Sequence, residues 1–242
     1  MIDEDDDTSG SSACITHEVD PAHSGLSLAD GVPKHSDVLR WRKAERARLI
    51  KERLEMSTST RKSYSDLIAE LLDVAIGDLS GRVVSGYWPF RGEPDLRGWL
   101  ERLESRGGRC ALPVVIETKA PLVFRIWGRG EKLERGVWDI PVPAAGKEVS
   151  PDVMIAPIVG YDRDAYRLGY GGGYFDRTLA ATPKRPLIIG VGYSQAAMPT
   201  IYPELHDIPM DKIVTERGIF IRAAKSGESA RNSHDTNGGS YL

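Results

Sequence analysis

The sequence is poor in cysteine and histidine. Of its 242 residues, two are cysteines, Cys14 and Cys110, and five are histidines. Two cysteines in unlike surroundings provide neither a disulfide framework nor a cysteine-based zinc site, and they indicate a reducing compartment. Four histidines lie near the chain ends, which leaves His206 as the one histidine of the central segment. We therefore expect neither a histidine-based triad nor a histidine-rich metal site.

Long hydrophobic runs are also missing. No apolar stretch approaches the length that is needed to cross a bilayer. The sequence begins Met-Ile-Asp-Glu-Asp-Asp-Asp, whereas a secretory signal begins with positive charge. These absences predict a cytoplasmic protein that does not associate with membranes.

Charge is distributed unevenly along the chain. Residues 1–37 contain nine acidic residues and one basic residue, with little apolar content, and residues 223–242 are rich in serine, glycine and asparagine. Such segments cannot offset their ordering entropy, so both are predicted to be disordered tails around one domain, residues 38–222. That domain has a net charge of +5, which suits an anionic small molecule better than a nucleic acid.

Two helices are expected at the start of the domain. Apolar residues at helical spacing form a stripe, with Asp37 as a possible cap: Trp41, Ala44, Ala47, Ile50 and Leu54. A second helix should begin near Ser57 and stop at Gly77. Its apolar residues follow the i, i+3, i+4, i+7 pattern: Tyr64, Leu67, Ile68, Leu71, Leu72 and Ala75.

Short apolar strands and helices alternate along the rest of the chain. Strands are predicted over residues 82–87, 109–116, 122–127, 152–159, 187–193 and 219–222. A helix with Pro94 in its first turn should end at Gly107, and a short helix should begin near Gly173. This alternation predicts a three-layer α/β fold in which helices flank a largely parallel sheet.

The segment from Arg167 to Arg177 is the most informative part of the sequence. It reads Arg-Leu-Gly-Tyr-Gly-Gly-Gly-Tyr-Phe-Asp-Arg, with four glycines in five positions. Backbone N–H groups without Cβ atoms can approach phosphate oxygens closely, and a helix behind them would add its positive dipole end. The spacing matches neither a dinucleotide-binding fingerprint nor a Walker A loop, and glycines alone would equally fit a tight hairpin. The arginines and tyrosines favour a ligand site.

Five motifs follow one another along the predicted domain. They are a basic first helix, Gly86-Tyr-Trp-Pro-Phe-Arg-Gly-Glu-Pro-Asp95, Gly136-Val-Trp-Asp-Ile-Pro-Val-Pro143, Ile158 to Arg177, and His206-Asp-Ile-Pro-Met-Asp-Lys-Ile-Val-Thr215. Together they resemble the motifs of the 5-formyltetrahydrofolate cyclo-ligase family, also called 5,10-methenyltetrahydrofolate synthetases. The resemblance covers roughly residues 38–222. It implies a fold related to the isomerase and CoA-transferase class, with ATP, Mg²⁺ and the folate meeting at the glycine-rich loop.

The resemblance also implies roles for particular residues. Those matching nucleotide contacts are Arg42, Lys43, Arg46, Arg167, Leu168, Gly169, Tyr170, Gly171, Gly172, Gly173, Tyr174 and Phe175. Those matching folate contacts are Trp88, Glu93, Trp138 and the loop residues Tyr170 to Tyr174. Asp176 and Asp207 match metal ligands, and Arg167 and Tyr174 are the candidates for catalysis.

Departures from the family and simpler interpretations leave some roles open. Arg42 stands where the family has a lysine, which Lys43 could replace, and Gly172 and Phe175 stand where some members have lysine and tyrosine. Without the resemblance, the helix arginines would be a solvated face and the tryptophans would be core residues. Glu93 before Pro94 could simply favour a helix start.

The resemblance implies that 5-formyltetrahydrofolate and ATP are converted to 5,10-methenyltetrahydrofolate, ADP and phosphate. One rival function is a non-catalytic folate- or nucleotide-binding regulator with the same fold. Another is a sugar-phosphate isomerase or an acyl-transfer enzyme of similar architecture, although the sequence offers no convincing base or nucleophile for it.

Overall fold

The computed structural model describes residues 28–29 and 32–222. The chain divides into two compact units, residues 1–44 and 45–242. The disorder predicted for residues 1–27 and 223–242 lies outside the described residues.

The first unit contains a short strand pair and the beginning of a helix. Strands β1 (Leu28–Ala29) and β2 (Val32–Pro33) pair antiparallel, and helix α1 (His35–Glu55) follows. Because α1 begins at His35, Asp37 lies in its first turn, where it accepts a hydrogen bond from Arg40 (2.8 Å). The prediction that Asp37 caps this helix was therefore wrong.

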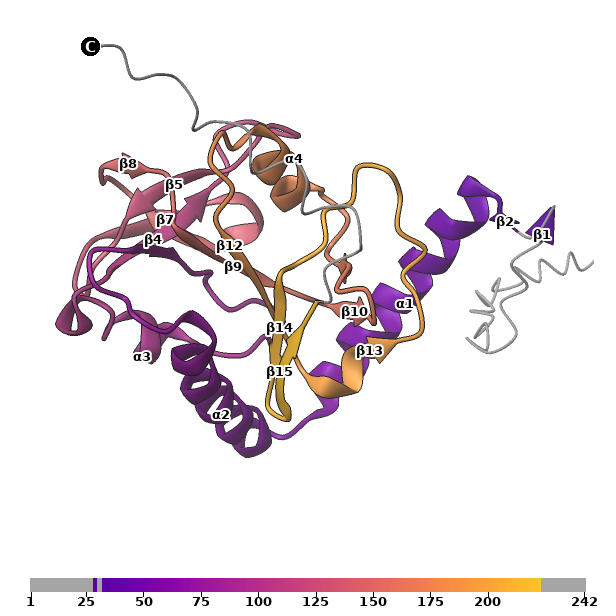
Figure 1. The fold of residues 1–242 in the computed structure, drawn as a ribbon, viewed down its shortest axis with the longest axis horizontal. Helices are drawn as coiled ribbons and strands as arrows, with labels where there is room; N and C mark the ends of the chain where they lie inside the picture. Colours follow the sequence, from indigo (N-terminus) through magenta and orange to yellow (C-terminus); the bar gives the residue numbers. More distant parts are fainter. Residues whose placement is uncertain (1–27, 30–31, 223–242) are drawn as a thin grey trace, which may run out of the picture. The chain divides into compact units, whose positions relative to one another are not determined.

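The second unit is built on an eight-stranded sheet (Figure 1). In spatial order its strands are β15 (Gly218–Ile221), β14 (Lys212–Thr215), β12 (Leu187–Val191), β9 (Val153–Pro157), β3 (Val83–Ser85), β4 (Arg109–Val114), β5 (Val123–Ile126) and β8 (Glu148–Val149). The strands from β14 to β4 are parallel, and β15, β5 and β8 are antiparallel to their neighbours. The expected sheet is confirmed. Its antiparallel edges and two of its strands, β14 and β8, were not predicted.

Smaller elements surround this sheet. They are α2 (Thr58–Ile76), α3 (Arg97–Leu100), the 3₁₀ turns η1 (Glu104–Arg106), η2 (Val137–Asp139) and η3 (Ser194–Ala196), the hairpin β6 (Leu133–Arg135) and β7 (Pro141–Pro143), a sheet of β10 (Gly160–Asp162), β11 (Arg167–Leu168) and β13 (Ala197–Met198), and α4 (Tyr174–Ala181). Among the described residues, no helix combines the length and apolarity of a membrane span.

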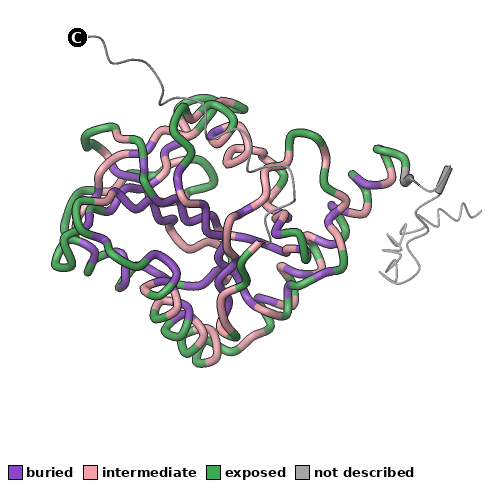
Figure 2. The backbone as a smooth tube through the Cα atoms, in the orientation of Figure 1, coloured by how far each residue is buried: buried purple, intermediate pink, exposed green. Residues whose placement is uncertain are grey.

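Alternating side chains of the central strands give the sheet two apolar faces. Val84, Ile155 and Ile189 are buried in one cluster with Ile68 and Leu72 of α2. The intervening residues of the same strands point to the other face, where Phe175 and Leu179 of α4 pack on Val83 and Met154. Helices therefore cover both faces of the sheet, and the buried backbone runs between them (Figure 2).

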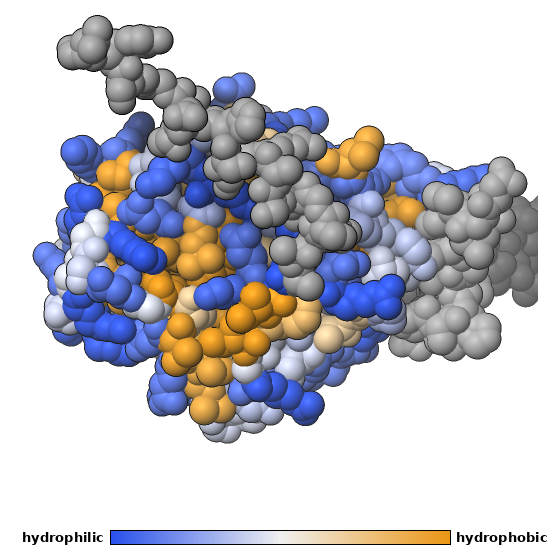
Figure 3. Space-filling model, viewed as in Figure 1, coloured by the Kyte–Doolittle hydropathy of each residue, from blue (hydrophilic) through white to orange (hydrophobic). Residues whose placement is uncertain are grey.

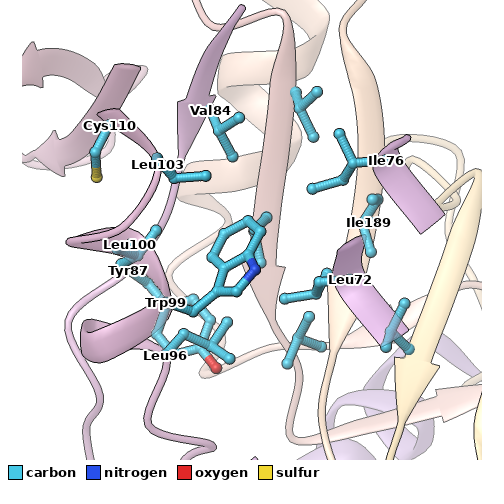
Figure 4. Packing of buried hydrophobic residues seen from close by; sticks show 14 of the residues in the cluster. Leu72, Ile76, Val84, Tyr87, Leu96, Trp99, Leu100, Leu103, Cys110 and Ile189 are labelled. Carbon is cyan, nitrogen blue, oxygen red and sulfur yellow. The ribbon is translucent and has the colours of Figure 1, made fainter. Parts of the chain in front are cut away.

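Trp99 lies in the middle of the larger cluster (Figure 4). Its indole N–H donates to Asp73 (2.6 Å), so the ring is buried with its polar atom satisfied. Leu96, Leu100 and Leu103 are buried beside it. The helix itself is shorter than predicted, because only α3 and a 3₁₀ turn form between Pro94 and Gly107.

The two ends of α2 agree with the prediction. Ser57 is the N-cap and accepts a hydrogen bond from the Thr60 N–H (3.0 Å), and Gly77 is the C-cap with φ of 74°. The buried face differs in part from the prediction. Ile68, Leu72 and Ala75 are buried as expected, whereas Leu67 is exposed and Ser65 and Ile76 are also buried.

Replacing Ser57 by alanine should lower the free energy of unfolding by about 1 kcal/mol, because the Thr60 N–H would lose its acceptor. Urea unfolding of the variant would measure this. Ser63 is exposed farther inside the helix, and a Ser63→Ala control should change stability by less than about 0.5 kcal/mol.

The apolar stripe predicted for α1 was wrong. In the part of the helix that belongs to the second unit, the buried residues are Glu45, Leu49 and Arg53, and Leu54 is exposed. The helix therefore buries a face with two charged side chains. The hydrogen bonds of Arg53, given below, explain how its charge is accommodated.

Exposed apolar side chains gather over α2 and β15 (Figure 3). They include Leu67 and Val74 of α2 and Phe220 and Ile221 of β15. Strand β15 ends the described sheet on this side and β8 ends it on the other. Both edge strands are short, four and two residues, which limits their pairing with another chain.

Candidate active site

The parallel strands define one place in the second unit where a ligand site is expected. From β3 the chain continues to β4 on one side, whereas β9 and β12 follow on the other. In such sheets ligands bind in the crevice beyond the carboxyl ends of the strands, at this switch point. The loops that leave β3 and β9 here begin at Gly86 and Ile158, and they contain the predicted site motifs.

The glycine-rich loop links β11 to α4. Gly171 and Gly173 have φ of 91° and 63°, a region that favours glycine. Gly173 is the N-cap of α4 and makes no side-chain cap hydrogen bond, so the first N–H groups of the helix are open to an anion. The prediction of a helix beginning directly behind the loop is confirmed.

Two arginines hold this loop by its carbonyl groups. Arg46 of α1 donates from Nε to the Gly169 carbonyl (2.7 Å), and Arg177 donates from Nη2 to the Gly172 carbonyl. The Arg177 guanidinium also lies 5.4 Å from the centre of the Tyr174 ring. A Cβ atom at Gly172 would lie 2.8 Å from that ring, which explains why glycine suits this position. Arg46 therefore reaches the glycine-rich loop, and its contact with the nucleotide stays a prediction.

Arg167 is buried between the loop and two carboxylates. It pairs with Asp176 (2.8 Å), lies 5.2 Å from the Phe175 ring centre, and keeps only 7% of its side-chain surface exposed. Burial lowers the pKa of Arg167, and the charges of Asp176 and Asp207 oppose that shift. Its Nε is buried without a hydrogen-bond partner in the described structure, as is Nε of Arg177. Two unused buried donors beside the loop fit an anionic ligand.

The predicted metal ligands already accept hydrogen bonds. Asp176 accepts from Arg167 and from the Ile208 N–H (3.2 Å), and Asp207 accepts from the Glu204 N–H (2.8 Å). The charges of both carboxylates favour the ionised form of the same guanidinium, that of Arg167. Within residues 28–29 and 32–222, no group of three or more metal-binding side chains occurs.

Glu93 forms the second part of the site. It is 6% exposed and accepts hydrogen bonds from the Tyr170 hydroxyl (2.9 Å) and the Phe90 N–H (2.9 Å). Burial raises the pKa of Glu93 to about 7, against the charge of Arg53 and these two hydrogen bonds. The carboxylate thus faces the glycine-rich loop, and its partners are not N–H groups of a helix.

Tyr170, a hydrogen-bond partner of Glu93, belongs to a group of three aromatic rings. Trp138 stacks on Phe90, with ring centres 6.4 Å apart and planes within 11°, and both rings contact Tyr170 at 6.3 and 5.7 Å. Trp138 is 53% exposed and adopts a left-handed conformation with φ of 58°. The group Phe90, Trp138 and Tyr170, called the aromatic group below, can stack on a flat heterocycle.

Other predicted site residues take different places. Trp88 packs edge-to-face on Trp127 (5.8 Å) and lies under Arg97, outside the aromatic group. Leu168 is buried in the apolar interior, and Phe175 packs on the sheet and under Arg167. Arg42 and Lys43 lie on the part of α1 that belongs to the first unit.

Two residues of the site were not predicted, Phe90 and Arg53. Phe90 lies inside the motif from Gly86 to Asp95, where an apolar ring is usually a core residue, so the residue type alone did not indicate a site. Arg53 follows Arg46 by seven residues, or two helical turns, and that spacing was the available signal.

These features define an α/β protein with a candidate small-molecule site at the switch point of its sheet. Comparison with known proteins is more specific. Residues 38–216 match the model of the 5-formyltetrahydrofolate cyclo-ligase family. The chain belongs to this family.

Individual relatives agree with that assignment. The 5-formyltetrahydrofolate cyclo-ligase of Mycolicibacterium smegmatis is 29% identical over 183 residues, which cover 72% of this chain and 93% of the relative. The cyclo-ligase of Escherichia coli K12 is 31% identical over 144 residues, 57% of this chain and 79% of the relative.

Solved structures show the same fold. The 5,10-methenyltetrahydrofolate synthetase of Aquifex aeolicus superposes with a TM-score of 0.67 at 27% identity, covering 80% of this chain and 99% of that one. A 5,10-methenyltetrahydrofolate synthetase from Mycoplasma pneumoniae superposes with a TM-score of 0.60 at 22% identity, covering 72% of this chain and 98% of that one. At this identity it supports the fold alone.

Proposed function

We propose that this protein is an enzyme that uses ATP to convert 5-formyltetrahydrofolate into 5,10-methenyltetrahydrofolate, releasing ADP and phosphate. The observation that supports this most directly is the joining of two unlike subsites at Tyr170. On one side lies a glycine-rich loop with buried arginine donors, and on the other a buried carboxylate beneath aromatic rings. A phosphate chain fits the first subsite and a pterin the second.

The proposed reaction transfers the γ-phosphoryl group to the formyl oxygen on N5. The O–P bond forms as the bond to ADP breaks, and N10 then adds to the activated carbon. Phosphate leaves with that oxygen, and loss of a proton from N10 gives the methenyl product. The protein has to align the oxygen with the phosphorus and neutralise spreading charge, which suits Arg167, Arg177 and the loop N–H groups.

Mg²⁺ is expected to accompany ATP. Magnesium in nucleotide sites is usually held by one or two carboxylates together with phosphate oxygens. Asp176 and Asp207 face the same arginine beside the loop and would supply those carboxylates, since each oxygen can accept more than one contact. When bound, the ion would neutralise phosphate charge.

The folate is expected to lie in the second subsite. Glu93 would accept hydrogen bonds from N–H groups of the pterin, and the aromatic group would stack on its ring. Trp88 stays a predicted folate contact, although its ring packs on Trp127. Arg42 and Lys43 stay predicted nucleotide contacts, with Leu168 and Phe175 shaping the loop from beneath.

Two further statements belong to the proposal. The relation of the fold to the isomerase and CoA-transferase class is supported by a mostly parallel sheet with helices on both faces. A cytoplasmic location is supported by the low cysteine content.

Turnover should depend strictly on ATP and a divalent cation. The purified protein would be incubated with 5-formyltetrahydrofolate and MgATP, and the methenyl product followed by its absorbance. Omission of ATP, or addition of a chelator, should abolish product formation.

The same assay separates the proposed function from the alternative functions. A binding regulator would retain folate and ATP affinity without turnover, and methenyl product formed without ATP would contradict the mechanism. The isomerase or acyl-transfer rival is disfavoured because the one histidine of the central segment, His206, is 71% exposed and pairs with Glu204.

A further inference from the structure

Arg53 is a buried arginine that the proposed reaction does not use. It is 4% exposed, and its guanidinium donates to three different segments. Nε donates to the Arg91 carbonyl (2.9 Å), Nη1 to the Ile158 carbonyl (3.4 Å) and Nη2 to the Tyr170 hydroxyl (2.6 Å). One side chain thus joins α1, the loop after β3, the end of β9 and the glycine-rich loop.

The bond to Tyr170 continues to Glu93. The Tyr170 hydroxyl accepts from Arg53 and donates to Glu93 Oε1 at 2.9 Å. Two such bonds in series keep the guanidinium within about 6 Å of the carboxylate, where opposite charges favour each other's ionised form. A purely structural arginine would need only the two carbonyls, so the third bond points to a role at the ligand site.

We propose that Arg53 is a positioning residue of the folate site, which acts through Tyr170 to keep the Glu93 carboxylate oriented and ionised for the pterin. This inference rests on the proposed function. It adds a residue that touches neither substrate, and it gives Tyr170 a second role as the link between the two subsites.

The charged and titratable groups around Glu93 determine what the loss of Arg53 should do to that carboxylate. They are Arg53 from α1, Tyr170 from the glycine-rich loop, and Tyr87 from the segment after β3, with the Phe90 N–H as a neutral donor. Burial raises the pKa of Glu93 to about 7 and the Arg53 charge lowers it. Loss of that charge should therefore raise the pKa further and leave less carboxylate ionised at neutral pH.

The test compares Arg53→Met with Arg53→Lys. The kcat/KM for 5-formyltetrahydrofolate would be measured at saturating MgATP between about pH 6 and 9. In the pH profile of kcat/KM, the acidic limb is the range in which activity falls as Glu93 is protonated. In Arg53→Met this limb should move to higher pH by about 1 unit. At neutral pH, KM for 5-formyltetrahydrofolate should rise roughly tenfold while KM for ATP stays unchanged. Arg53→Lys keeps the charge and should leave the limb near its wild-type position, with a loss of only a few fold.

Lys51→Met is the control, because Lys51 is an exposed cation of the same helix, outside the bonds that join Arg53 to Tyr170. It should leave the profile unchanged. If the acidic limb of folded Arg53→Met stays in place, or KM for ATP rises equally, the inference is wrong. An inactive wild-type protein would instead contradict the proposed function.

If Arg53→Met does not fold by circular dichroism and thermal unfolding, Tyr170→Phe tests the same link. That variant keeps both carbonyl bonds of Arg53 and removes the hydroxyl that joins it to Glu93. The acidic limb should again move to higher pH, and an unmoved limb would overturn the inference.

Discussion

Replacing Glu93 by glutamine is expected to weaken binding of 5-formyltetrahydrofolate by about 10- to 150-fold while ATP affinity stays unchanged. A charge-assisted hydrogen bond contributes about 1.5–3 kcal/mol, and the buried carboxylate beside the aromatic group is the acceptor for the pterin. Calorimetric titration with each ligand would measure both affinities. Normal folate affinity in the Gln variant would remove Glu93 from the site.

The same substitution should change how stability depends on pH. Because burial raises the pKa of Glu93 from 4.5 to about 7, the folded protein keeps a proton there that the unfolded chain has released. The free energy of unfolding should therefore fall by about 3 kcal/mol as pH rises through this window. Glu93→Gln should remove that fall.

Urea unfolding at about pH 4.5 and pH 8 would show the difference. Glu134→Gln, at an exposed position of β6, is the matched control and should keep the wild-type pH dependence. An identical fall in the wild type and Glu93→Gln would mean that Glu93 titrates normally, in conflict with its burial.

Replacing Arg167 by methionine should lower kcat at least about 100-fold, because a fixed positive charge beside the transferred phosphate would be lost. It should also lower the free energy of unfolding by about 3–5 kcal/mol, since Asp176 would stay buried without its partner. Because of this ion pair, Arg167 should affect stability as well as turnover.

The control for Arg167 is Arg163→Met, in the exposed turn between β10 and β11. Steady-state kinetics and thermal unfolding of both variants would separate the two effects. A destabilised Arg167→Met with wild-type kcat would make Arg167 a structural residue only.

Local signals predicted much of the fold. Serine and glycine at the ends of α2 fixed its bounds, and β-branched runs located the central strands. The buried face of α1 was not predictable, because it contains Glu45 and Arg53, whose burial depends on partners far along the chain. Strand β14 was not predicted for a related reason. Its four residues are too few to show a clear pattern, and the strand is stabilised by pairing with β12 and β15.

The site was predictable where a motif fixed it. The glycine-rich loop, Glu93, Trp138 and Tyr170 come together as the motifs indicated. Motifs give no side-chain direction, so the sequence could not show that Trp88 turns toward Trp127 while Phe90 turns toward Trp138.

The position of β3 beside β9 also has a consequence for how the chain folds. Their contact includes a hydrogen bond from the Val83 N–H to Asp152 (2.9 Å), which joins residues 69 positions apart. Chains dominated by such distant pairings fold in milliseconds to seconds, because the intervening loop must close first. Meanwhile β4 and β5, which are adjacent in sequence, can pair early and expose an unpaired edge. Refolding yield should therefore fall as protein concentration rises, through association of half-formed sheets.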